Sequence, residues 1–298
     1  MLKRRDKTST IRRRAAGNRN SKSITVMLPN GSCNSTGSGR VNTSAFLALG
    51  GLCPEGYVPD KRCFFPVLAS RPNIDFIVGR PQDAPALAAR GCIDGFVAFE
   101  DVVVEAEEAG LRGIEKLLEL PFGFVEVVVA VRRDAVFSNI ADLFAYADFH
   151  SVTCVSDRAF LARRLLRNLR AYRRYFGSTP PVIEDNGAIT AAGNPSVRIT
   201  RSAGSCEPHV TIASFDFAVV VRSSGGTIRE CDLKVIATIG TYRPAFFCRP
   251  GVMEDPVLAV QMNEFIKGLE AAKDRFNRFC DCMRHNYHKG CFRQNSSE

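Results

Sequence analysis

Residues 215–239 have the sequence FDFAVVVRSSGGTIRECDLKVIATI, in which two apolar segments flank a polar turn. Phe215 to Val221 and Leu233 to Ile239 are short and rich in β-branched residues, which is typical of buried strands. The residues between them carry hydroxyl groups and glycines, so the chain is expected to turn directly after the first strand. The segment therefore predicts a strand, a loop and a second strand of an α/β domain.

The turn at Val221 to Ile228 has the composition of an anion-binding loop. Successive backbone N–H groups in such a turn converge on an anion, glycines allow close approach, and hydroxyl groups add donors. The alternative is an ordinary linker, because turns of Ser and Gly are common. If the loop binds a phosphate group, the candidate ligands are Ser223, Ser224, Gly225, Gly226 and Thr227.

Towards the N-terminus the chain alternates short strands and helices. A polar loop from Pro29 to Gly39 follows the first of these strands. Such alternation predicts an α/β fold with a largely parallel sheet. The predicted strands are Ile24–Leu28, Asp75–Gly79 and Gly95–Ala98, and the predicted helices are Ala45–Leu49, Gln82–Arg90 and Asp101–Glu108.

A long apolar strand from Phe122 to Val131 marks the expected boundary between two domains. Tyr242 to Cys248 is expected to return the chain to the first domain, and a helix is predicted from Asp255 to about Phe279. Gly177 to Pro195 is rich in turn-forming residues and predicts a long loop.

Phe160 to Phe176 predicts one amphipathic helix with a basic face. Apolar residues recur at spacings of three and four, and arginines occupy the other side. That face is either a solvated surface or a patch that meets phosphate. The apolar positions are Leu161, Leu165, Leu169, Tyr172 and Phe176, and the basic ones are Arg163, Arg167, Arg170 and Arg174.

The positive charge is concentrated in the first 23 residues. These carry nine Lys and Arg against Asp6 alone, which accounts for +8 of the formal net charge of +9. The segment lacks the apolar run of a secretory signal, so it is expected to be either a disordered basic extension or an organelle transit peptide. The expected location is the cytoplasm, with an organelle as the alternative. Nucleic acid is an expected partner only through this tail. No stretch predicts a membrane span.

The eleven cysteines are scattered, and several lie in apolar runs, which favours reduced thiols over disulfides. Near the C-terminus, Cys280, Cys282, His285, His288 and Cys291 form a cluster that could bind zinc. Their spacing fits no standard zinc module, so we expect incidental thiols near a helix end and no metal.

Four segments, in order, resemble the ATP phosphoribosyltransferase family. Residues 77–106, IVGRPQDAPALAARGCIDGFVAFEDVVVEA, match an Arg-x-x-Asp-Ile-Pro helix followed by Gly-Ala-Ala-Asp-x-Gly-Ile-Thr-Gly-x-Asp. Residues 120–131, LPFGFVEVVVAV, are similar to the interdomain strand, and residues 203–207, AGSCE, to Asn-Gly-Ser-x-Glu. Residues 215–239 are similar to the segment that binds phosphoribosyl diphosphate, with its Glu-Thr-Gly-Thr-Thr-Leu loop.

The resemblance implies a two-domain fold of the periplasmic-binding-protein type (type II), with a cleft between two α/β domains. Domain I would be residues 24–120 plus 240–250, domain II residues 121–239, and residues 251–298 a C-terminal helical extension. It also implies ATP and phosphoribosyl diphosphate as substrates, Mg²⁺ as cofactor and assembly as a homo-oligomer. Besides the loop, the implied substrate-binding residues are Arg40, Arg80, Asp83, Asp101, Glu207 and Asp216.

Three acidic or hydroxyl positions of the family pattern are changed. The strand acid before the loop is Val220, the loop Glu is Ser223, and one loop threonine is Gly226. The alternative for Arg80, Asp83 and Asp101 is a structural role, as ion-pairing or helix-capping groups. The alternatives to an active enzyme are a non-catalytic family member, acting as a regulatory subunit or as an assembly or RNA-associated protein, and a small-ligand binding domain of the same form.

Overall fold

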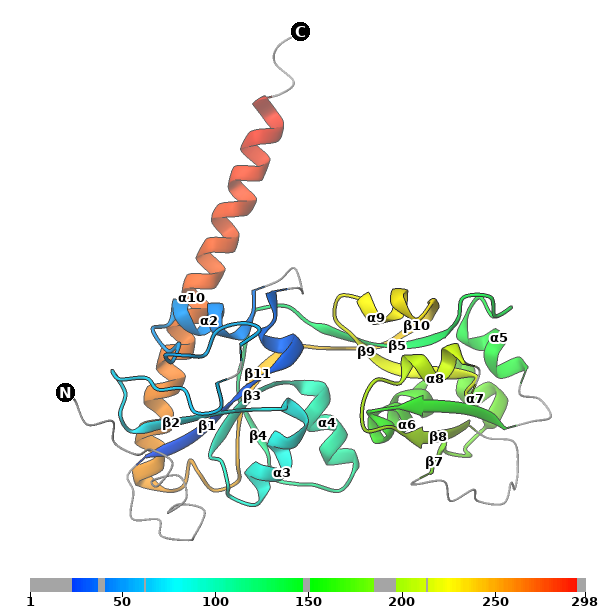
Figure 1. The fold of residues 1–298 in the computed structure, drawn as a ribbon, viewed down its shortest axis with the longest axis horizontal. Coiled ribbons are helices and arrows are strands. Elements are labelled where there is room, and N and C mark those ends of the chain that lie inside the picture. Colours follow the sequence, from blue (N-terminus) through cyan, green and yellow to red (C-terminus); the bar gives the residue numbers. More distant parts are fainter. Residues whose placement is uncertain are drawn as a thin grey trace.

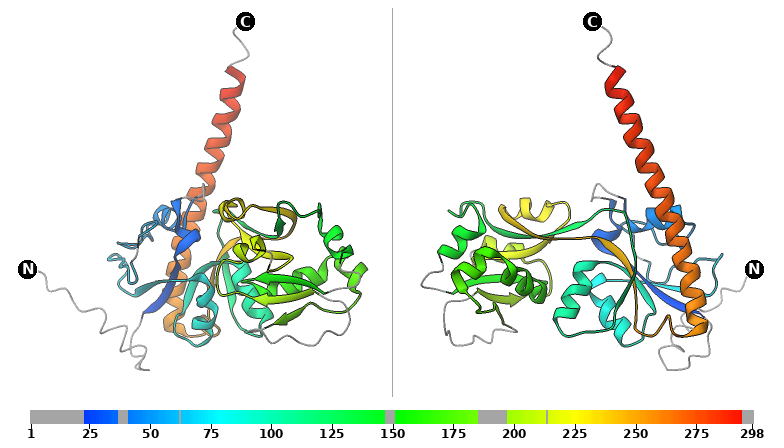
Figure 2. Two further views of the ribbon diagram at one scale, coloured as in Figure 1. Left: turned by 45° about the vertical axis from the view of Figure 1, so that its right-hand side comes forward. Right: turned by 180° about the vertical axis from the view of Figure 1, so that it is seen from behind.

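The computed structural model describes residues 23–36, 41–61, 63–146, 151–184, 197–212 and 214–293, without the side chains of Ser32 and of 283–293. The basic tail and Arg40 therefore lie outside the described residues, and so do the side chains of His285, His288 and Cys291. Two lobes lie side by side, and a long helix projects away from the first of them (Figures 1 and 2).

The first lobe, lobe I, is built on a five-stranded sheet with the order β2-β1-β3-β11-β4. Strand β1 pairs in parallel with β2 and β3, whereas β11 is antiparallel to β3 and β4. The strands are β1 (Ile24–Pro29), β2 (Ile74–Gly79), β3 (Gly95–Phe99), β4 (Glu115–Glu119) and β11 (Pro244–Cys248). The helices are η1 (Gly31–Asn34), α2 (Thr43–Leu49), η3 (Pro81–Asp83), α3 (Ala84–Ala89), α4 (Glu100–Glu108) and α10 (Pro256–Arg293).

The second lobe, lobe II, contains a six-stranded sheet with the order β10-β5-β9-β6-β8-β7. Strands β9, β6, β8 and β7 are parallel neighbours, whereas β5 is antiparallel to β9 and β10. The strands are β5 (Val125–Arg132), β6 (Val152–Ser156), β7 (Val182–Glu184), β8 (Val197–Arg201), β9 (Phe217–Arg222) and β10 (Leu233–Tyr242). The helices are α5 (Ile140–Ala145), α6 (Ala159–Asn168), α7 (Arg170–Phe176), α8 (Glu207–Thr211) and α9 (Gly226–Glu230).

The chain passes between the lobes twice, from β4 to β5 and from β10 to β11. The predicted return of Tyr242 to Cys248 is confirmed, because β11 pairs with β3 and β4 in the sheet of lobe I. The two-lobed α/β fold of the periplasmic-binding-protein type is confirmed as well. In open sheets of this kind, ligands bind outside the carboxyl ends of parallel strands, where the strand order reverses. In lobe II those ends belong to β6, β8 and β9.

Helix α10 completes the core of lobe I. Its Met262, Phe265 and Leu269 are fully buried beside residues of β1, α2 and β11. The helix begins after Asp255, whose carboxylate accepts from the N–H groups of Val257 and Leu258 at 2.9 and 3.1 Å. The predicted helix is confirmed but continues to Arg293, beyond the expected end near Phe279.

The prediction of a single helix from Phe160 to Phe176 was wrong. Leu169 adopts an extended conformation, with φ −68° and ψ 138°, and separates α6 from α7. No Gly or Pro marks this break, and the apolar spacing continues across it. Packing decides it: Tyr172 and Phe176 of α7 stack around Phe144 of α5, so α7 turns away from the axis of α6.

Candidate functional site

The loop after β9 presents a series of backbone N–H groups. Gly225 lies in the left-handed region, with φ 73° and ψ 13°, and α9 begins at the next residue. Within the described residues, the N–H groups of Ser224, Gly225, Gly226 and Thr227 donate to no acceptor. The first N–H groups of a helix have no partner inside the helix, so such a turn provides donors for an anion.

Two arginines fix the backbone of this loop. The Nε and Nη2 of Arg222 donate to Oε2 of Glu126 on the neighbouring strand β5, at 3.0 and 2.6 Å. On the other side, Nη1 of Arg229 donates to the carbonyl oxygen of Ser224 at 3.2 Å. Both arginines are thus engaged by loop and strand groups, and the N–H donors of the loop are held in place before any ligand binds.

The loop lines a cavity of about 340 Å³, together with Glu207 and with Ser35 of lobe I. The structure therefore brings together six of the predicted site residues, the five of the loop and Glu207. Glu207 is the first residue of α8, directly after the turn that follows β8. Val220, at the family's acid position, is 4% exposed and packs in the core with Val128 and Ile228. Among the described residues that line this cavity, Glu207 supplies the carboxylate.

The structure does not bring Asp216 to the loop. Its Oδ2 accepts from the N–H and the hydroxyl of Thr153, the second residue of β6, at 2.8 and 2.7 Å, and Asp216 itself directly precedes β9. The loop lies at the other end of β9, and six residues of strand span roughly 20 Å at about 3.3 Å each. The prediction that Asp216 binds substrate with the loop is therefore corrected: Asp216 joins the starts of two parallel strands.

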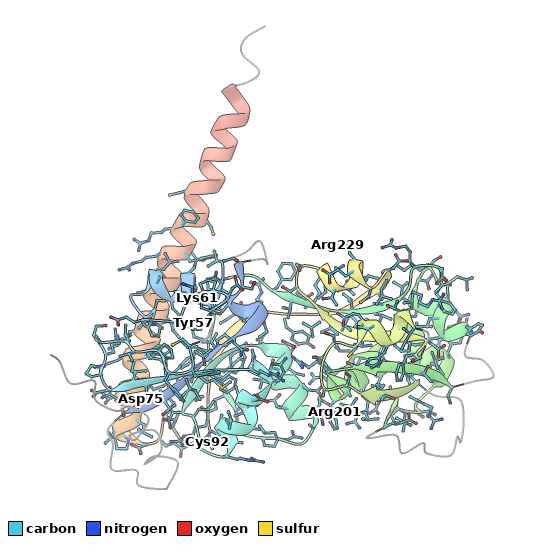
Figure 3. All side chains as sticks on the ribbon, viewed as in Figure 1. Tyr57, Lys61, Asp75, Cys92, Arg201 and Arg229 are labelled. Atoms are coloured by element: carbon cyan, nitrogen blue, oxygen red, sulfur yellow. The ribbon has the colours of Figure 1, made fainter. Side chains whose placement is uncertain are left out.

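A second cavity, of about 680 Å³, lies between the lobes. Lobe I contributes Arg80 and Asp83, which directly follow β2, and lobe II contributes Arg158 after β6 and Arg201 at the end of β8. In Figure 3, Arg201 lies on the edge of lobe II that faces lobe I. Both cavities thus use the carboxyl ends of parallel strands, as expected for this class of sheet.

Asp101 faces lobe II and is almost completely buried. Its Oδ2 accepts from Nε of Arg158 at 3.1 Å, and the two side chains are 2% and 9% exposed. Burial raises the pKa of Asp101 to about 6, although the charge and hydrogen bond of Arg158 lower it in part. Arg158 also contacts Asp157, with 2.9 Å between Nη1 and Oδ2. Asp101 therefore acts as an ion-pairing group between the lobes, and it does not line either cavity.

Glu105, one turn further along α4, caps a helix of the other lobe. Its carboxylate accepts from the N–H groups of Phe160 and Leu161, at 3.4 and 2.6 Å, in the first turn of α6. Burial raises the pKa of Glu105, and the two N–H bonds partly oppose that shift. Glu108, in the last turn of α4, pairs with Arg164 at 3.0 Å. One face of α4 thus joins α6 and the residue before it through three acidic residues at helical spacing, Asp101, Glu105 and Glu108.

Sequence reasoning missed the residues that lobe II contributes after β6. Asp157 and Arg158 directly follow the strand and line the interlobe cavity, yet neither was a candidate. A signal was present: polar residues after an apolar strand mark the edge of a parallel sheet. Cys206 lies in the turn before Glu207, where burial raises the pKa of its thiol to about 12. A thiol with that pKa is protonated at neutral pH and is not a nucleophile.

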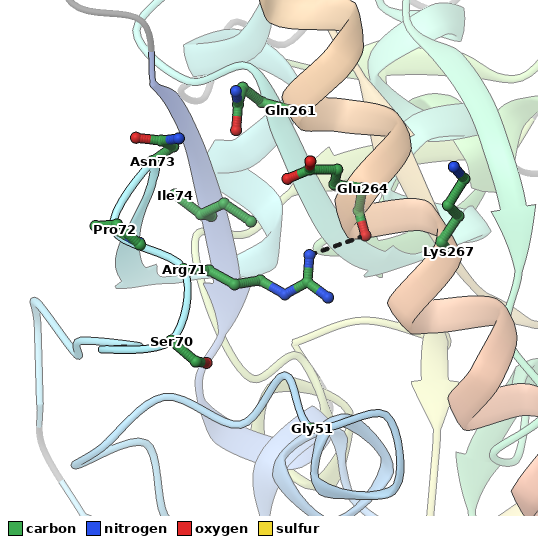
Figure 4. A pocket seen from close by; sticks show the side chains of 9 residues that line it. All are labelled: Gly51, Ser70, Arg71, Pro72, Asn73, Ile74, Gln261, Glu264 and Lys267. Atoms are coloured by element: carbon green, nitrogen blue, oxygen red, sulfur yellow. Dashed lines mark hydrogen bonds between the residues drawn. The ribbon is translucent and has the colours of Figure 1, made fainter.

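A further cavity, of about 550 Å³, lies on lobe I between α10 and the start of β2 (Figure 4). Arg71 donates from Nη1 to the carbonyl oxygen of Glu264 at 3.2 Å across it. This cavity holds none of the predicted site residues, and it lies at the amino end of β2.

No described side chains form a group of three or more His, Cys, Asp or Glu that could hold a metal ion. The cysteines whose side chains are described are free thiols. No helix among the described residues combines the length and the apolar character needed to cross a bilayer.

Comparisons with known proteins agree on one family. A family model described as ATP phosphoribosyltransferase matches residues 80–271, more than half of the chain. An ATP phosphoribosyltransferase of Ignicoccus hospitalis is 22% identical over 214 residues, which cover 72% of this chain and 63% of that protein. One of Rubrobacter xylanophilus is 26% identical over 167 residues, which cover 56% and 63% respectively. The chain thus spans less than two thirds of the length of these relatives.

Among solved structures, a similar chain belongs to the ATP phosphoribosyl transferase (HisG:HisZ) complex from Thermotoga maritima. The TM-score is 0.55 at 15% identity, and the match covers 84% of this chain and 98% of that chain. At this identity the likeness concerns the fold.

Proposed function

This chain belongs to the ATP phosphoribosyltransferase family, and from that premise we propose that it transfers the phosphoribosyl group of phosphoribosyl diphosphate to N1 of ATP, in histidine biosynthesis. The observation that carries the proposal is the loop after β9, where four N–H groups without a described acceptor line a cavity beside three hydroxyl-bearing residues. Such a loop suits the 5-phosphate of the ribose.

The interlobe cavity is the proposed place for the triphosphate of ATP. Arg80, Arg158 and Arg201 line it, and the guanidinium group binds phosphate oxygens in bidentate geometry. Asp83 lines the same cavity as a possible partner for a substrate hydroxyl group. Asp101 would act indirectly, because its ion pair positions Arg158 at the cavity.

Mg²⁺ is proposed as the cofactor. This ion is commonly bound by one or two carboxylates together with substrate phosphates. Glu207 is a carboxylate in the loop cavity and fits that requirement. When bound, the ion would neutralise charge on the departing diphosphate. The chain's own contribution would be to orient the ribose phosphate through the loop and to keep the two substrates in adjacent cavities.

Val220 and Ser223 supply the specific observation that favours a second candidate, a family member without turnover. Neither side chain can accept from ribose hydroxyls as a carboxylate does. The loss of one such contact weakens transition-state binding by about 1 to 3 kcal/mol, or roughly 10- to 100-fold in rate. This candidate binds phosphoribosyl diphosphate and forms no product.

The test is turnover of ATP, phosphoribosyl diphosphate and Mg²⁺ by the full chain, followed in the ultraviolet. Thr227→Val removes one hydroxyl of the loop, and Thr241→Val, at an exposed position on β10, is the matched control. We expect wild type and control to form product at the same rate, and Thr227→Val to form it at least about 10-fold more slowly. Binding without product would favour the second candidate. If neither product nor binding is detected, both candidates are refuted.

Assembly as a homo-oligomer remains a proposal that follows from the family. It is tested by light scattering of the full chain during size-exclusion chromatography. A mass of twice the 32.7 kDa of the chain or more supports it, and a mass of one chain at all concentrations contradicts it.

A further inference from the structure

Arginines from two helices gather at a cavity outside the proposed active site. Arg163, Arg164 and Arg167 of α6 and Arg173 of α7 line about 820 Å³ of space, together with the turn from Gly177 to Pro181. Glu108 is the carboxylate of this lining, so the wall carries a net charge of about +3 from side chains that are ionised at neutral pH. Arg163 and Arg167 of the predicted basic face line this hollow, whereas Arg170 and Arg174 lie outside it.

Two of the four guanidinium groups are held in place by other contacts. The first is Arg163, which lies over the ring of Phe160 at 5.4 Å from the centroid. Arg201, which lines the interlobe cavity and not this one, lies near the same ring at 5.8 Å. Arg173 donates from Nη2 to the carbonyl oxygen of Asn168 at 2.8 Å, at the end of α6. Stacked or anchored arginines lose less side-chain entropy when they bind an anion.

Arg167 has no carboxylate partner within the described residues. Arg164 pairs with Glu108, with 3.0 Å between Nη1 and Oε1. Like charges that face one concave space repel each other unless an anion enters it. A hollow of about 820 Å³ with several cations on its wall suits a compact ligand with several negative charges better than a single carboxylate.

We propose that this cavity is a binding site for a ligand with two or more phosphate groups, separate from the loop after β9. Guanidinium groups match phosphate oxygens in charge and in bidentate geometry, and the hydroxyl of Ser178 adds a donor at the wall. The same chemistry could come from a free polyphosphorylated metabolite or from successive phosphates of a nucleic acid. The cavity does not use any residue of the proposed active site.

The experiment is a calorimetric titration of the full chain with inorganic tripolyphosphate. Arg163→Gln with Arg167→Gln removes two charges from the cavity. Arg170→Gln with Arg174→Gln removes two charges from α7 at positions that do not line it, and is the matched control. The N-terminal basic residues are present in every variant, so their contribution cancels.

We expect the cavity variant to bind at least about 10-fold more weakly, because a lost charge-assisted hydrogen bond costs that factor or more. The control should bind within about threefold of wild type. Equal losses in both variants, or no loss in either, would overturn the site. Thermal unfolding of each variant shows whether a loss reflects misfolding.

A parallel titration with a short single-stranded RNA distinguishes the source of the phosphates. If RNA binds more tightly than tripolyphosphate, and RNA binding is weaker only in the cavity variant, the ligand is a polynucleotide. If RNA binding responds equally to both variants, the RNA contact is diffuse and the site is for small ligands. Turnover of ATP and phosphoribosyl diphosphate should not change in the cavity variant, because the cavity shares no lining residue with the proposed active site, so failure of this proposal is separable from failure of the proposed activity.

Discussion

At the scale of single residues, Gly225 allows the chain to turn in the proposed phosphate-binding loop. Its φ of +73° is a conformation that side chains with a Cβ rarely adopt, and an added Cβ would lie 3.4 Å from Nη1 of Arg229. We expect Gly225→Ala to lower the free energy of unfolding by about 1 to 2 kcal/mol. Gly226→Ala is the control, because the same methyl group there meets only Oγ of Ser224 at 3.6 Å. Urea denaturation of both variants measures the difference. Equal stabilities would contradict the conformational argument.

Asp101 gives a prediction about pH. Its pKa is raised in the folded state, from 3.8 to about 6, so protonation of Asp101 favours folding. The stabilisation from this group is complete below about pH 4 and is lost as the pH rises through 6. Asp101→Asn mimics the protonated form, and Arg158 keeps Asp157 as an ionic partner. We expect wild type and Asp101→Asn to be similarly stable at pH 4.

At pH 7.5 Asp101→Asn should be the more stable protein, by at most about 3 kcal/mol. Thermal and urea denaturation across this range measure the difference. A less stable variant at pH 7.5 would show that the ion pair with Arg158 stabilises the fold by more than its burial costs.

The sequence was sufficient to predict the turn after β9 as a candidate phosphate-binding loop, but not the ion pair of Asp101. A loop of five adjacent residues is a local feature, and its hydroxyl and glycine content can be recognised directly. The partner of Asp101 lies 57 residues away in the other lobe, and no local pattern connects the two. Asp216 lies at the opposite end of β9 from the loop, and its partner Thr153 is 63 residues away, so no local pattern shows this contact.

At the scale of elements, α4 and α6 form the contact between the lobes. Glu105 of α4 accepts from two N–H groups in the first turn of α6, and its charge also suits the helix dipole. We expect Glu105→Ala to lower the free energy of unfolding by about 1 to 2 kcal/mol. Glu107→Ala, on the same helix, is the control, since no hydrogen bond or ion pair of its side chain is found among the described residues.

Amide hydrogen exchange provides the specific measurement for this cap. The N–H groups of Phe160 and Leu161 should exchange faster than in wild type in Glu105→Ala, and at the wild-type rate in Glu107→Ala. Faster exchange in both variants would mean that the effect is a general loosening of α4.

Strands β1, β2, β3, β5, β9 and β10 could be predicted from the sequence, whereas β4, β6, β7 and β8 were not predicted. The predicted strands contain runs of apolar and β-branched residues, which can be recognised in the sequence. The break at Leu169 leaves the apolar period intact, since it depends on how Tyr172 and Phe176 pack against Phe144. Tertiary packing of that kind cannot be obtained from periodicity.

At the scale of the whole molecule, the first part of α10, up to Phe276, is part of the core of lobe I, whereas the later part projects away from it (Figure 1). Gly268 allows the helix to approach the turn that follows α2 closely, because an added Cβ would lie 2.8 Å from the side chain of Leu52. Gly268→Ala should lower the free energy of unfolding by about 1 to 3 kcal/mol, although alanine favours a helix by about 1 kcal/mol. Glu270→Ala, at an exposed position on the same helix, should be neutral or slightly stabilising. Urea denaturation distinguishes these outcomes, and a stabilising Gly268→Ala would contradict the close approach.

The two lobes bring together residues that are distant in the chain, and the proposed function depends on that arrangement. Ser35 of lobe I lines the loop cavity of lobe II, and Arg80 of lobe I lines the interlobe cavity with Arg201. The ordered family segments allowed the fold to be predicted, because a shared pattern carries information about long-range topology. The ligands themselves remain proposals.

The central claim is that the loop from Ser223 to Thr227 binds the phosphate of phosphoribosyl diphosphate. The most direct measurement is calorimetric titration of the full chain with phosphoribosyl diphosphate and Mg²⁺, for wild type, Thr227→Val and Thr241→Val. We expect one ligand per chain, binding that is weaker by at least about 10-fold for Thr227→Val, and unchanged binding for Thr241→Val. Wild-type protein that does not bind phosphoribosyl diphosphate, or binds it equally in all three, would contradict the account.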